Sequence, residues 1–339
     1  MQRCLDLAKL GAQTVAPNPM VGAVLVYEDV VIGEGYHMQF GQPHAEVNCL
    51  NHVAAHHQHL IEKSTLYVSL EPCHHVGKTP PCTSLIIEKK IPTVVIGCLD
   101  PFEKVNGSGK WYLEENGVKV ITGILESEAM DINKRFICFH QHKRPYILLK
   151  WAQSNNRKIG NAVERIPISN DISNLLVHKW RTEEMGIMVG TQTVLTDNPQ
   201  LTARLYPGKN PIRIVIDKSL RIPKAVHIFD TNATTIVFNE KINKVKQHVS
   251  FIQMDAMSGL KNILDVLYHR NIQSIMVEGG AQLLQSFIDE GFWDEARVIT
   301  NRNMYISEGV DAPFLTHANC WKQSKFQQDE ITYFKHQNP

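Results

Sequence analysis

The feature that most constrains this chain is a set of metal-binding residue types in two separate segments. His44 and Glu46 lie two residues apart in the first segment, and Cys73 and Cys82 each follow a proline in the second. One imidazole and two thiolates suit Zn²⁺ and leave a fourth position open for water. Zinc makes such a water acidic enough to act as a nucleophile, and a nearby carboxylate can carry its proton. The pattern therefore predicts one zinc ion held by His44, Cys73 and Cys82, with Glu46 as the proton donor and shuttle.

The His-x-Glu and Pro-Cys pattern is similar to that of the zinc deaminases, except in the spacing of the cysteines. Those enzymes usually have two residues between the cysteines, whereas eight separate Cys73 from Cys82. A glycine and two adjacent prolines allow a loop of this length to fold back onto one metal. The alternative is that the histidine and both cysteines are buried core residues. Glu46 and a proline before each cysteine favour the metal site.

The length and the net charge of the chain limit its domain number and the kinds of partner it can bind. A chain of 339 residues is longer than one hydrophobic core usually supports, so two domains are expected. Basic residues followed by Pro145 predict a helix end, which places the boundary between domains 1–143 and 144–339. A formal net charge of +1 gives no general electrostatic reason to bind nucleic acid or a membrane. No apolar run approaches a membrane span, and residues 1–10 do not resemble a signal peptide, so a cytoplasmic enzyme is expected.

The cysteine count argues against a disulfide framework. There are seven cysteines, an odd number, scattered through a long chain. Apart from the two candidate zinc ligands, the cysteines are expected to be packing residues, namely Cys4, Cys49, Cys98, Cys138 and Cys320.

The hydrophobic pattern predicts alternating strands and helices in both halves of the chain. In the first half, strands are expected over 21–27, 30–35, 66–70, 93–97 and 118–121, and helices over 44–56, 83–90, 109–115 and 125–141. In the second half, strands are expected over 146–151, 186–190, 212–216, 234–238 and 274–277, and helices over 170–184, over 260–270 and from about 281. Strands separated by helical stretches favour right-handed crossovers and largely parallel sheets. The predicted fold class is α/β with two domains.

A series of motifs along the chain resembles one enzyme family. In the first half the motifs lie at residues 16–24, 44–47, 71–82, 100–101, 107–109 and 133–136. In the second half they lie at residues 144–150, 180–181, 189–204 and 277–280. Taken in order, they resemble the bifunctional deaminase/reductase family of riboflavin biosynthesis over about residues 1–295. Residues 71–82, EPCHHVGKTPPC, look like the long-loop zinc motif of that family.

The resemblance implies two consecutive activities on one chain. An N-terminal, cytidine-deaminase-like α/β/α zinc domain would convert 2,5-diamino-6-(5-phosphoribosylamino)pyrimidin-4-one to 5-amino-6-(5-phosphoribosylamino)uracil by hydrolytic deamination. A C-terminal, dihydrofolate-reductase-like α/β domain would then reduce the ribosyl group to ribityl with NADPH. The implied cofactors are Zn²⁺ and NADPH, and the implied partner is a small phosphorylated pyrimidine. No nucleic-acid or membrane partner is expected, and a homo-oligomer is plausible from the family.

Matching positions carry over as candidate binding residues. The deaminase substrate is assigned to Asn18, His74 and His75. The reductase substrate is assigned to Lys150, Arg165, Arg181, Leu201, Arg204 and Glu278. The cofactor is assigned to Ala152, Pro167, Thr193, Asp197, Gly280, Ala281, Gln282 and Leu283.

General chemistry supports several of these assignments. An asparagine amide offers a donor and an acceptor to a pyrimidine edge, although Asn18 between two prolines is also ordinary turn chemistry. Guanidinium groups bind phosphate through paired hydrogen bonds, although a single arginine such as Arg165 can equally be a surface residue. The helix expected to begin near Ala281 would direct its backbone N–H groups at a cofactor phosphate.

The chain departs from the family at three places. Where the family usually has serine-leucine-aspartate-glycine, this chain has Ser154 followed by Asn155, Asn156 and Arg157. The tryptophan expected before Ile168 is Pro167. The tail after about residue 294 lacks the expected pair of glycines. All three differences fall in the second half.

Three other functions fit part of the pattern. The first is an active deaminase whose reductase-like domain is catalytically impaired. The second is a nucleic-acid-editing deaminase with an RNA-binding domain, which predicts a basic, aromatic surface that the balanced charge argues against. The third is a non-catalytic zinc module, which would need a fourth protein ligand and would leave Glu46 without a role.

Overall fold

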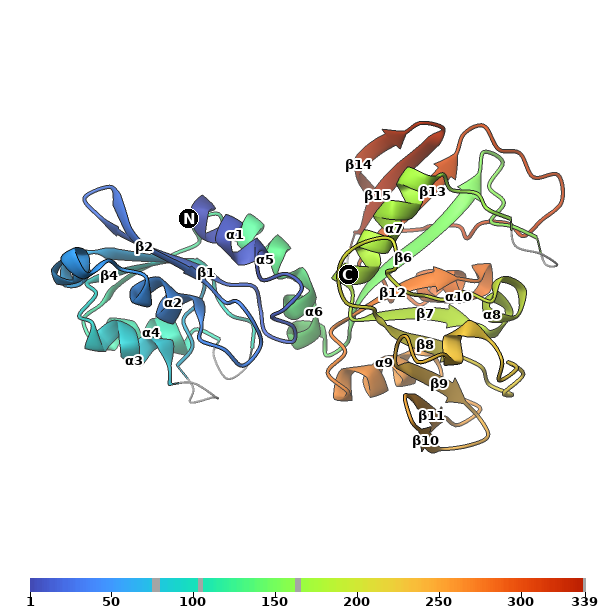
Figure 1. Ribbon diagram of the computed structural model, residues 1–339, viewed down its shortest axis with the longest axis horizontal. Coiled ribbons are helices and arrows are strands. Elements are labelled where there is room, and N and C mark those ends of the chain that lie inside the picture. Colours follow the sequence, from blue (N-terminus) through green and yellow to red (C-terminus); the bar gives the residue numbers. More distant parts are fainter. Residues whose placement is uncertain (75–79, 103–105, 162–165, 338–339) are drawn as a thin grey trace. The chain divides into compact units, whose positions relative to one another are not determined.

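The computed structural model describes residues 1–74, 80–102, 106–161 and 166–337. The chain divides into two compact units, Met1–Lys143 and Arg144–Pro339. In each unit, helices pack on a central β-sheet (Figure 1). Among the described residues, no helix is both long and apolar enough to cross a membrane. The predicted two-domain α/β class is confirmed.

The sheet of the first unit has five strands in the order β2-β1-β3-β4-β5. Their bounds are β1 Gly22–Tyr27, β2 Val30–Tyr36, β3 Thr65–Leu70, β4 Thr93–Cys98 and β5 Lys119–Thr122. β1 is antiparallel to both of its neighbours, β2 and β3, whereas β3, β4 and β5 run parallel to one another. The strands expected over 21–27 and 30–35 are present as β1 and β2, which form an antiparallel hairpin. Its two turn residues, Glu28 and Asp29, both have positive φ, as a tight hairpin turn requires.

Helices cover both faces of this sheet. One core contains residues of α2 (Ala45–Asn51), α3 (Cys82–Glu88) and α4 (Ser108–Glu115). Smaller cores on the other face contain residues of α1 (Gln2–Lys9) and α5 (Glu126–Ile132). These are the three layers of an α/β/α unit. Of the five remaining thiols, Cys4, Cys49, Cys98 and Cys138 are buried, whereas Cys320 in the second unit is exposed, so its predicted packing role is wrong.

Two predicted helices of the first unit have different bounds in the structure. The helix expected over 44–56 ends at Asn51 and is followed by the 3₁₀ helix η1, Ala55–Lys63. The helix expected over 125–141 is broken at Asn133 into α5 and α6 (Lys134–His142). The Asn133 amide accepts a hydrogen bond from Met20 N–H at 2.8 Å and donates one to Met20 O at 2.9 Å. The break therefore coincides with a residue that anchors the loop before β1.

The sheet of the second unit has ten strands in the order β10-β11-β9-β8-β7-β12-β6-β13-β15-β14. Its parallel strands are β6 Tyr146–Ser154, β7 Gly186–Gly190, β8 Ile212–Ile216, β9 Thr235–Asn239, β11 Val249–Gln253, β12 Ser274–Gly279 and β13 Glu295–Asn301. The edges are antiparallel: β10 Lys244–Lys246 at one end, and β14 Ala318–Phe326 with β15 Asp329–His336 at the other.

Helices also cover both faces of the second sheet. Residues of α9 (Leu260–His269) and α10 (Ala281–Asp289) pack on one face, and residues of α7 (Asp171–Glu183) and α8 (Thr191–Asp197) on the other. Successive residues of β6 point to opposite cores, as the period of a strand dictates: Ile147 and Leu149 to one, Leu148 to the other. A further 3₁₀ helix, η2, spans His227–Phe229.

A buried ion pair joins the residues just before β6 and just before β13. Arg144 donates two hydrogen bonds to the Asp294 carboxylate, at 2.7 and 2.8 Å. The same carboxylate accepts the N–H of Ile147 at 2.7 Å. Since Asp294 directly precedes β13, this pair fixes the start of β6 beside the start of β13, as in the parallel register between them.

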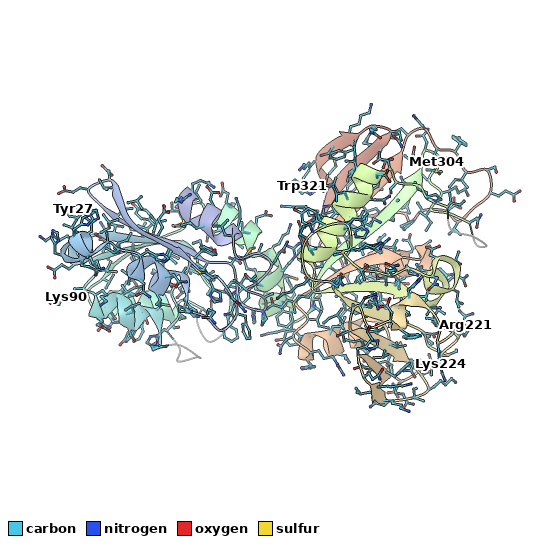
Figure 2. The ribbon with its side chains drawn as sticks, in the orientation of Figure 1. Tyr27, Lys90, Arg221, Lys224, Met304 and Trp321 are labelled. Atoms are coloured by element: carbon cyan, nitrogen blue, oxygen red, sulfur yellow. The ribbon has the colours of Figure 1, made fainter. Side chains whose placement is uncertain are left out.

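The strands that begin after residue 277 differ from the prediction, which contained none there. β13 is buried along its whole length, so it lacks the alternation of apolar and polar residues that identifies a strand. β14 lies at the sheet edge with mainly exposed residues, among them Trp321, which Figure 2 labels on this strand. Neither pattern is distinctive in a single sequence.

Candidate functional site

The structure brings the three predicted zinc ligands together. His44 Nδ1 lies 3.3 Å from the sulfur of Cys82 and 3.5 Å from that of Cys73, and all three ligand atoms lie within 4.8 Å of one another. His44 directly precedes α2, Cys73 lies in the segment after β3, and Cys82 is the first residue of α3. One imidazole and two thiols around a common point fit a zinc ion with a fourth position left for water.

The electrostatics of the cluster favour a thiolate. A hydrogen bond with Cys82, together with the neighbouring His44, lowers the pKa of the Cys73 thiol although burial opposes this. A thiol with a lowered pKa is the form that ligates a metal. The same hydrogen bond raises the pKa of Cys82, so in the absence of a metal one thiolate is shared between the two sulfurs.

Glu46 lies on the first turn of α2 beside the cluster. Its residue is 3% exposed, and burial raises the pKa of its carboxyl group. A carboxyl group whose pKa is raised holds a proton more readily and can accept one and return it. Close packing of α2 on β2 sets its position: a Cβ on Gly35 would lie 2.2 Å from the backbone nitrogen of Cys49, so only glycine allows this approach.

A second carboxylate supports the segment that carries Cys73. Glu71 is buried and accepts three backbone N–H groups, from Asp100 at 3.1 Å, Gly107 at 3.0 Å and Lys110 at 3.0 Å. This ties the end of β3 to the start of α4. The helix then approaches so closely that a Cβ on Gly109 would lie 2.1 Å from the carbonyl oxygen of Pro72.

Replacing Gly109 with alanine is expected to displace Pro72 and hence the adjoining Cys73. We expect overpacking to cost about 1–3 kcal/mol of stability in the first unit and to lower the zinc content per chain. Thermal unfolding and metal analysis of the purified protein measure both. Gly259→Ala is the matched control, because a Cβ there meets nothing within 4 Å. Equal zinc content and stability in the two variants would contradict this account.

The loop before β1 contains the predicted substrate residue Asn18. Its side-chain amide lies 3.1 Å from His37 Nε2, and the His37 ring packs edge-on against the ring of His44 at 5.4 Å between centroids. Asn18 therefore lies one side chain away from a zinc ligand. His37 is not predictable from the sequence, because an isolated histidine outside any motif carries no recognisable signal.

The other predicted deaminase residues are less fully described. His74 stacks on Tyr112 with ring centroids 4.0 Å apart, and its Nδ1 lies 3.3 Å from the hydroxyl of Thr83. His75 lies outside the described residues.

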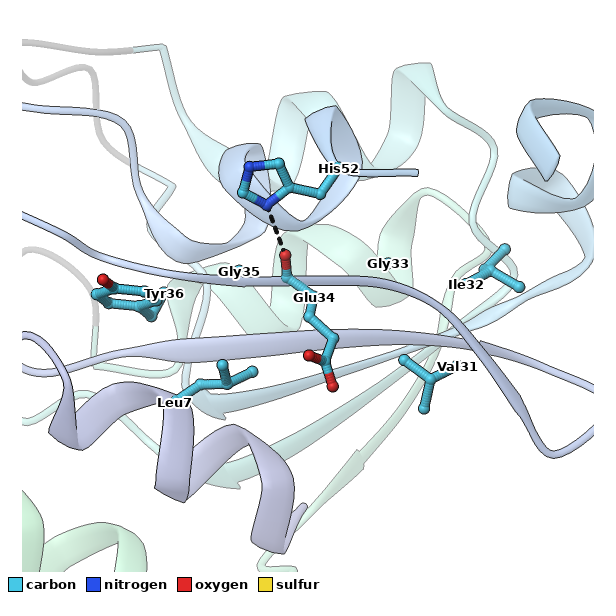
Figure 3. A pocket seen from close by; sticks show the side chains of 8 residues that line it. All are labelled: Leu7, Val31, Ile32, Gly33, Glu34, Gly35, Tyr36 and His52. Carbon is cyan, nitrogen blue, oxygen red and sulfur yellow. Dashed lines mark hydrogen bonds between the residues drawn. The ribbon is translucent and has the colours of Figure 1, made fainter. Parts of the chain in front are cut away.

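A groove of about 500 Å³ lies elsewhere on the first unit, along β2 (Figure 3). His52 donates from Nδ1 to the carbonyl oxygen of Glu34 across it at 2.9 Å. Its lining is Leu7, Val31, Ile32, Gly33, Glu34, Gly35, Tyr36 and His52, which includes none of the predicted zinc ligands.

In the second unit, the structure brings Lys150, Arg181 and Glu278 together. Arg181 donates two hydrogen bonds to the Glu278 carboxylate, at 2.7 and 2.8 Å, and Lys150 Nζ lies 3.7 Å from the same carboxylate. Burial alone would raise the pKa of Glu278, but the two cations and the hydrogen bonds lower it to about 2. Lys150 was expected at the end of a strand and instead lies in the middle of β6. The three residues form a buried, compensated charge cluster.

Arg204 and Leu201 lie beside this cluster in the segment after α8. Arg181 donates a third hydrogen bond to the carbonyl oxygen of Thr202 at 2.9 Å, which joins α7 to this segment. Leu201 is buried with a φ of +53°, while Arg204 is exposed. His178 on α7 accepts a hydrogen bond from the N–H of Leu205 at 3.3 Å. Burial, followed by the charges of Arg181 and Arg204, lowers the pKa of His178 to about 4.

His178 is expected to make stability depend on pH. Between its ordinary pKa of 6.5 and its folded pKa of about 4, the unfolded chain binds a proton that the folded protein does not. Stability therefore falls as pH falls through this window. In His178→Asn, whose side-chain oxygen can still accept from Leu205, we expect a smaller loss. Unfolding free energies of both proteins at pH 7, 6, 5 and 4 measure it, and parallel curves would contradict the prediction.

The predicted cofactor residues gather mainly around two helix starts. Thr193 on α8 packs against the turn before α10, since a Cβ on Gly279 would lie 2.9 Å from its side chain. Gly280 has a φ of +76° and precedes α10, so the N–H groups of Ala281, Gln282 and Leu283 lie in its first turn. A helix start of this kind fits a phosphate of NADPH.

The remaining cofactor residues lie farther along their elements. Asp197 is the last residue of α8, and Ala152 lies in the second half of β6. Pro167 is exposed, and Arg165 lies outside the described residues.

The turn that departs from the family keeps a defined geometry. Asn156 accepts hydrogen bonds from the Ser154 hydroxyl at 2.7 Å and from Ile306 N–H at 3.2 Å, as a carboxylate there could. Arg157 has a φ of +60°, a conformation that favours glycine. Its guanidinium donates to the carbonyl oxygen of Pro313 at 3.1 Å and lies 5.6 Å from the ring centroid of Phe314, which offsets this strain.

Comparisons with known proteins cover both units. The cytidine and deoxycytidylate deaminase zinc-binding region matches residues 1–98, and the RibD C-terminal domain matches residues 145–301. The chain thus holds a deaminase domain and a reductase domain, whose cofactors are Zn²⁺ and NADPH. The editing-deaminase and impaired-reductase interpretations are not favoured.

Curated relatives and solved structures agree with the two domain matches. The riboflavin biosynthesis protein RibD of Aquifex aeolicus is 40% identical over 303 residues, which covers 87% of this chain and 83% of that protein. The RibD of Bacillus amyloliquefaciens is 36% identical over 307 residues, covering 87% and 81%. The diaminohydroxyphosphoribosylaminopyrimidine deaminase/5-amino-6-(5-phosphoribosylamino)uracil reductase of Thermotoga maritima superposes with a TM-score of 0.89 at 35% identity, covering 99% of this chain and 97% of that one. The chain therefore belongs to the RibD family of riboflavin biosynthesis proteins.

Proposed function

We propose that the first unit deaminates 2,5-diamino-6-(5-phosphoribosylamino)pyrimidin-4-one and that the second reduces the product, 5-amino-6-(5-phosphoribosylamino)uracil. The observation that carries the proposal is the convergence of His44, Cys73 and Cys82 within 4.8 Å, beside the buried Glu46. The second unit adds a buried cluster of charges near a helix start that suits a dinucleotide phosphate.

Glu46 carries the proton chemistry of the first reaction. When bound to His44, Cys73 and Cys82, zinc would acidify a water to serve as the nucleophile. Glu46 would take a proton from that water and pass it to the adjacent ring nitrogen as the water oxygen bonds to the ring carbon that bears the amino group. It would then move the remaining hydroxyl proton to the amino nitrogen, so that the carbon–nitrogen bond breaks and ammonia leaves with a carbonyl in its place.

The residues of the second unit bind and orient the second substrate. Arg204 and Lys150 supply positive charge for the substrate phosphate and sugar, and Glu278 holds Arg181 and Lys150 in place. The first turn of α10 would hold a phosphate of the cofactor. When bound, NADPH would supply the hydride that converts the ribosyl group to ribityl.

The two activities can be assayed separately on the purified 339-residue protein. We expect ammonia release from the diaminopyrimidine without NADPH, and NADPH oxidation when the phosphoribosylamino-uracil is supplied directly. Absence of ammonia release by zinc-loaded protein would overturn the first activity. Absence of NADPH oxidation would leave a deaminase with an inactive second unit.

A small pyrimidine substrate is consistent with the family. The homo-oligomer, the lack of a nucleic-acid partner and the cytoplasmic location stay predictions. Size-exclusion chromatography with light scattering measures the first of these.

A further inference from the structure

Arg204 lies between two residues whose backbone N–H groups are both bound by side chains. Asn210 Oδ1 accepts the N–H of Ala203 at 2.9 Å, and His178 Nδ1 accepts the N–H of Leu205 at 3.3 Å. Ala203 is buried, whereas Arg204 is exposed. The main chain is therefore anchored on each side of this arginine, while the arginine itself is open to solvent.

His178 is the anchor that joins this segment to the charge cluster of the second unit. It is 5% exposed and lies on α7 three residues before Arg181, so the two side chains share one face of the helix. Arg181 binds both the Glu278 carboxylate and the carbonyl oxygen of Thr202. One face of α7 therefore holds the segment at Thr202 and again at Leu205.

The charges that act on His178 place Arg204 at this cluster. Burial is the main cause of the lowered pKa of His178, and the positive charges of Arg181, Arg204 and Lys150 lower it further. The negative charge of Glu278 acts in the opposite direction. Since such effects decline with distance, the four charges lie around one imidazole. The neutral ring that results is the form whose Nδ1 can accept a hydrogen bond.

We propose that His178 is a positioning residue of the second site, which holds Arg204 beside the Lys150–Arg181–Glu278 cluster through the N–H of Leu205 and so sets the affinity of this site for a phosphorylated substrate. The inference rests on the proposed reduction and deepens it. A guanidinium group binds phosphate through paired, directed hydrogen bonds, so a displaced backbone is enough to weaken them.

Two substitutions of His178 separate its hydrogen bond from the packing of its ring. Leucine fills much of the same space but cannot accept from Leu205, whereas asparagine keeps an oxygen near the position of Nδ1. For His178→Leu we expect KM for the phosphoribosylamino-uracil to rise about tenfold, with kcat and KM for NADPH within about twofold of wild type. For His178→Asn we expect most of this rise to be absent. Equal KM values in the two variants would overturn the proposal.

Asn210 provides a test that leaves the buried ring in place. It is exposed and anchors the other side of Arg204, so Asn210→Ala should raise the same KM without changing that for NADPH. If His178→Leu does not fold, this variant decides, and an unchanged KM overturns the proposal. The matched control is His248→Leu, because the ring of His248 also contacts a backbone group, the carbonyl oxygen of Phe229 at 3.0 Å. Its KM should equal that of wild type.

A double-mutant cycle tests whether His178 acts through Arg204. Arg204→Ala alone should raise KM for the phosphoribosylamino-uracil. Adding His178→Leu to it should change KM by less than about twofold, since the group being positioned is gone. Fully additive increases would show that His178 acts on something other than Arg204, and would overturn the proposal.

The position of the segment and its affinity for phosphate are also measured without turnover. By hydrogen exchange and mass spectrometry, the peptide that contains Leu205 should exchange faster in His178→Leu than in wild type or His178→Asn. Ribose 5-phosphate, titrated calorimetrically, should bind His178→Leu about tenfold more weakly than wild type. Equal exchange, equal binding or no binding by wild type would each overturn the proposal. If wild type oxidises no NADPH, the proposed reduction fails, while this titration still decides the role of His178.

Discussion

Replacing Glu46 with glutamine is expected to lower the rate of deamination by about 10²–10⁴-fold while zinc remains bound. Glutamine has nearly the same shape as glutamate but cannot accept and return a proton. The three predicted zinc ligands, His44, Cys73 and Cys82, are unchanged in this variant. Ammonia release under saturating substrate and metal analysis of the same preparation measure the two quantities.

The control for this variant is Glu115→Gln, which changes an exposed glutamate at the end of α4 in the same unit. It should leave both rate and zinc content unchanged. If Glu46→Gln keeps more than a tenth of the activity, another group carries the proton. If it loses zinc, Glu46 is instead part of the metal site.

Replacing Glu278 with glutamine is expected to destabilise the second unit by about 3–5 kcal/mol and to abolish NADPH oxidation. The change removes the counter-charge of two buried cations, since the side chains of Lys150 and Arg181 are only 12% and 11% exposed. Ammonia release by the first unit should persist, because the two sites lie in separate units. Trp111 is the one tryptophan before residue 144, so denaturant unfolding followed by tryptophan fluorescence reports mainly on the second unit.

Glu330→Gln is the matched control for this substitution. Glu330 pairs with Arg302 through two hydrogen bonds of similar length, at 2.9 and 3.1 Å, but the two side chains are 25% and 49% exposed. A solvated pair of this kind contributes only about 0.2–1 kcal/mol. A loss of stability in Glu278→Gln no larger than that in Glu330→Gln would show that the buried cluster is not held by the charge of Glu278.

The features that the sequence predicted correctly are local ones. Glu28 and Asp29 tolerate the positive φ of a tight turn, so the β1–β2 hairpin can be recognised from neighbouring residues alone. The convergence of His44, Cys73 and Cys82 follows from residue type and spacing, while their role as zinc ligands stays a prediction. The helix α9 follows from its one-sided apolar pattern.

The features that the sequence did not predict depend on partners distant along the chain. Arg181 and Glu278 are 97 positions apart, and no local pattern indicates that two candidate substrate residues bind each other. The contacts of the two His37 ring nitrogens with Pro43 and Asn18 likewise join residues that are separated along the chain. The turn at Asn156 and Arg157 lacks the usual glycine, and its contacts come from residues after 300. These interactions exist only once tertiary structure forms.

The place of β6 in its sheet has a consequence for synthesis on the ribosome. β6 is the first strand of the second unit to be translated, yet it lies between β12 and β13, two of the later ones. The strand order lets the first unit close as soon as residue 143 is made, because all five of its strands precede that point. The nascent second unit must instead keep one side of β6 unpaired until translation has passed Asn301. During that interval Ile147 and Leu149 lie on an open strand edge, which is where a chaperone that binds apolar extended segments would act.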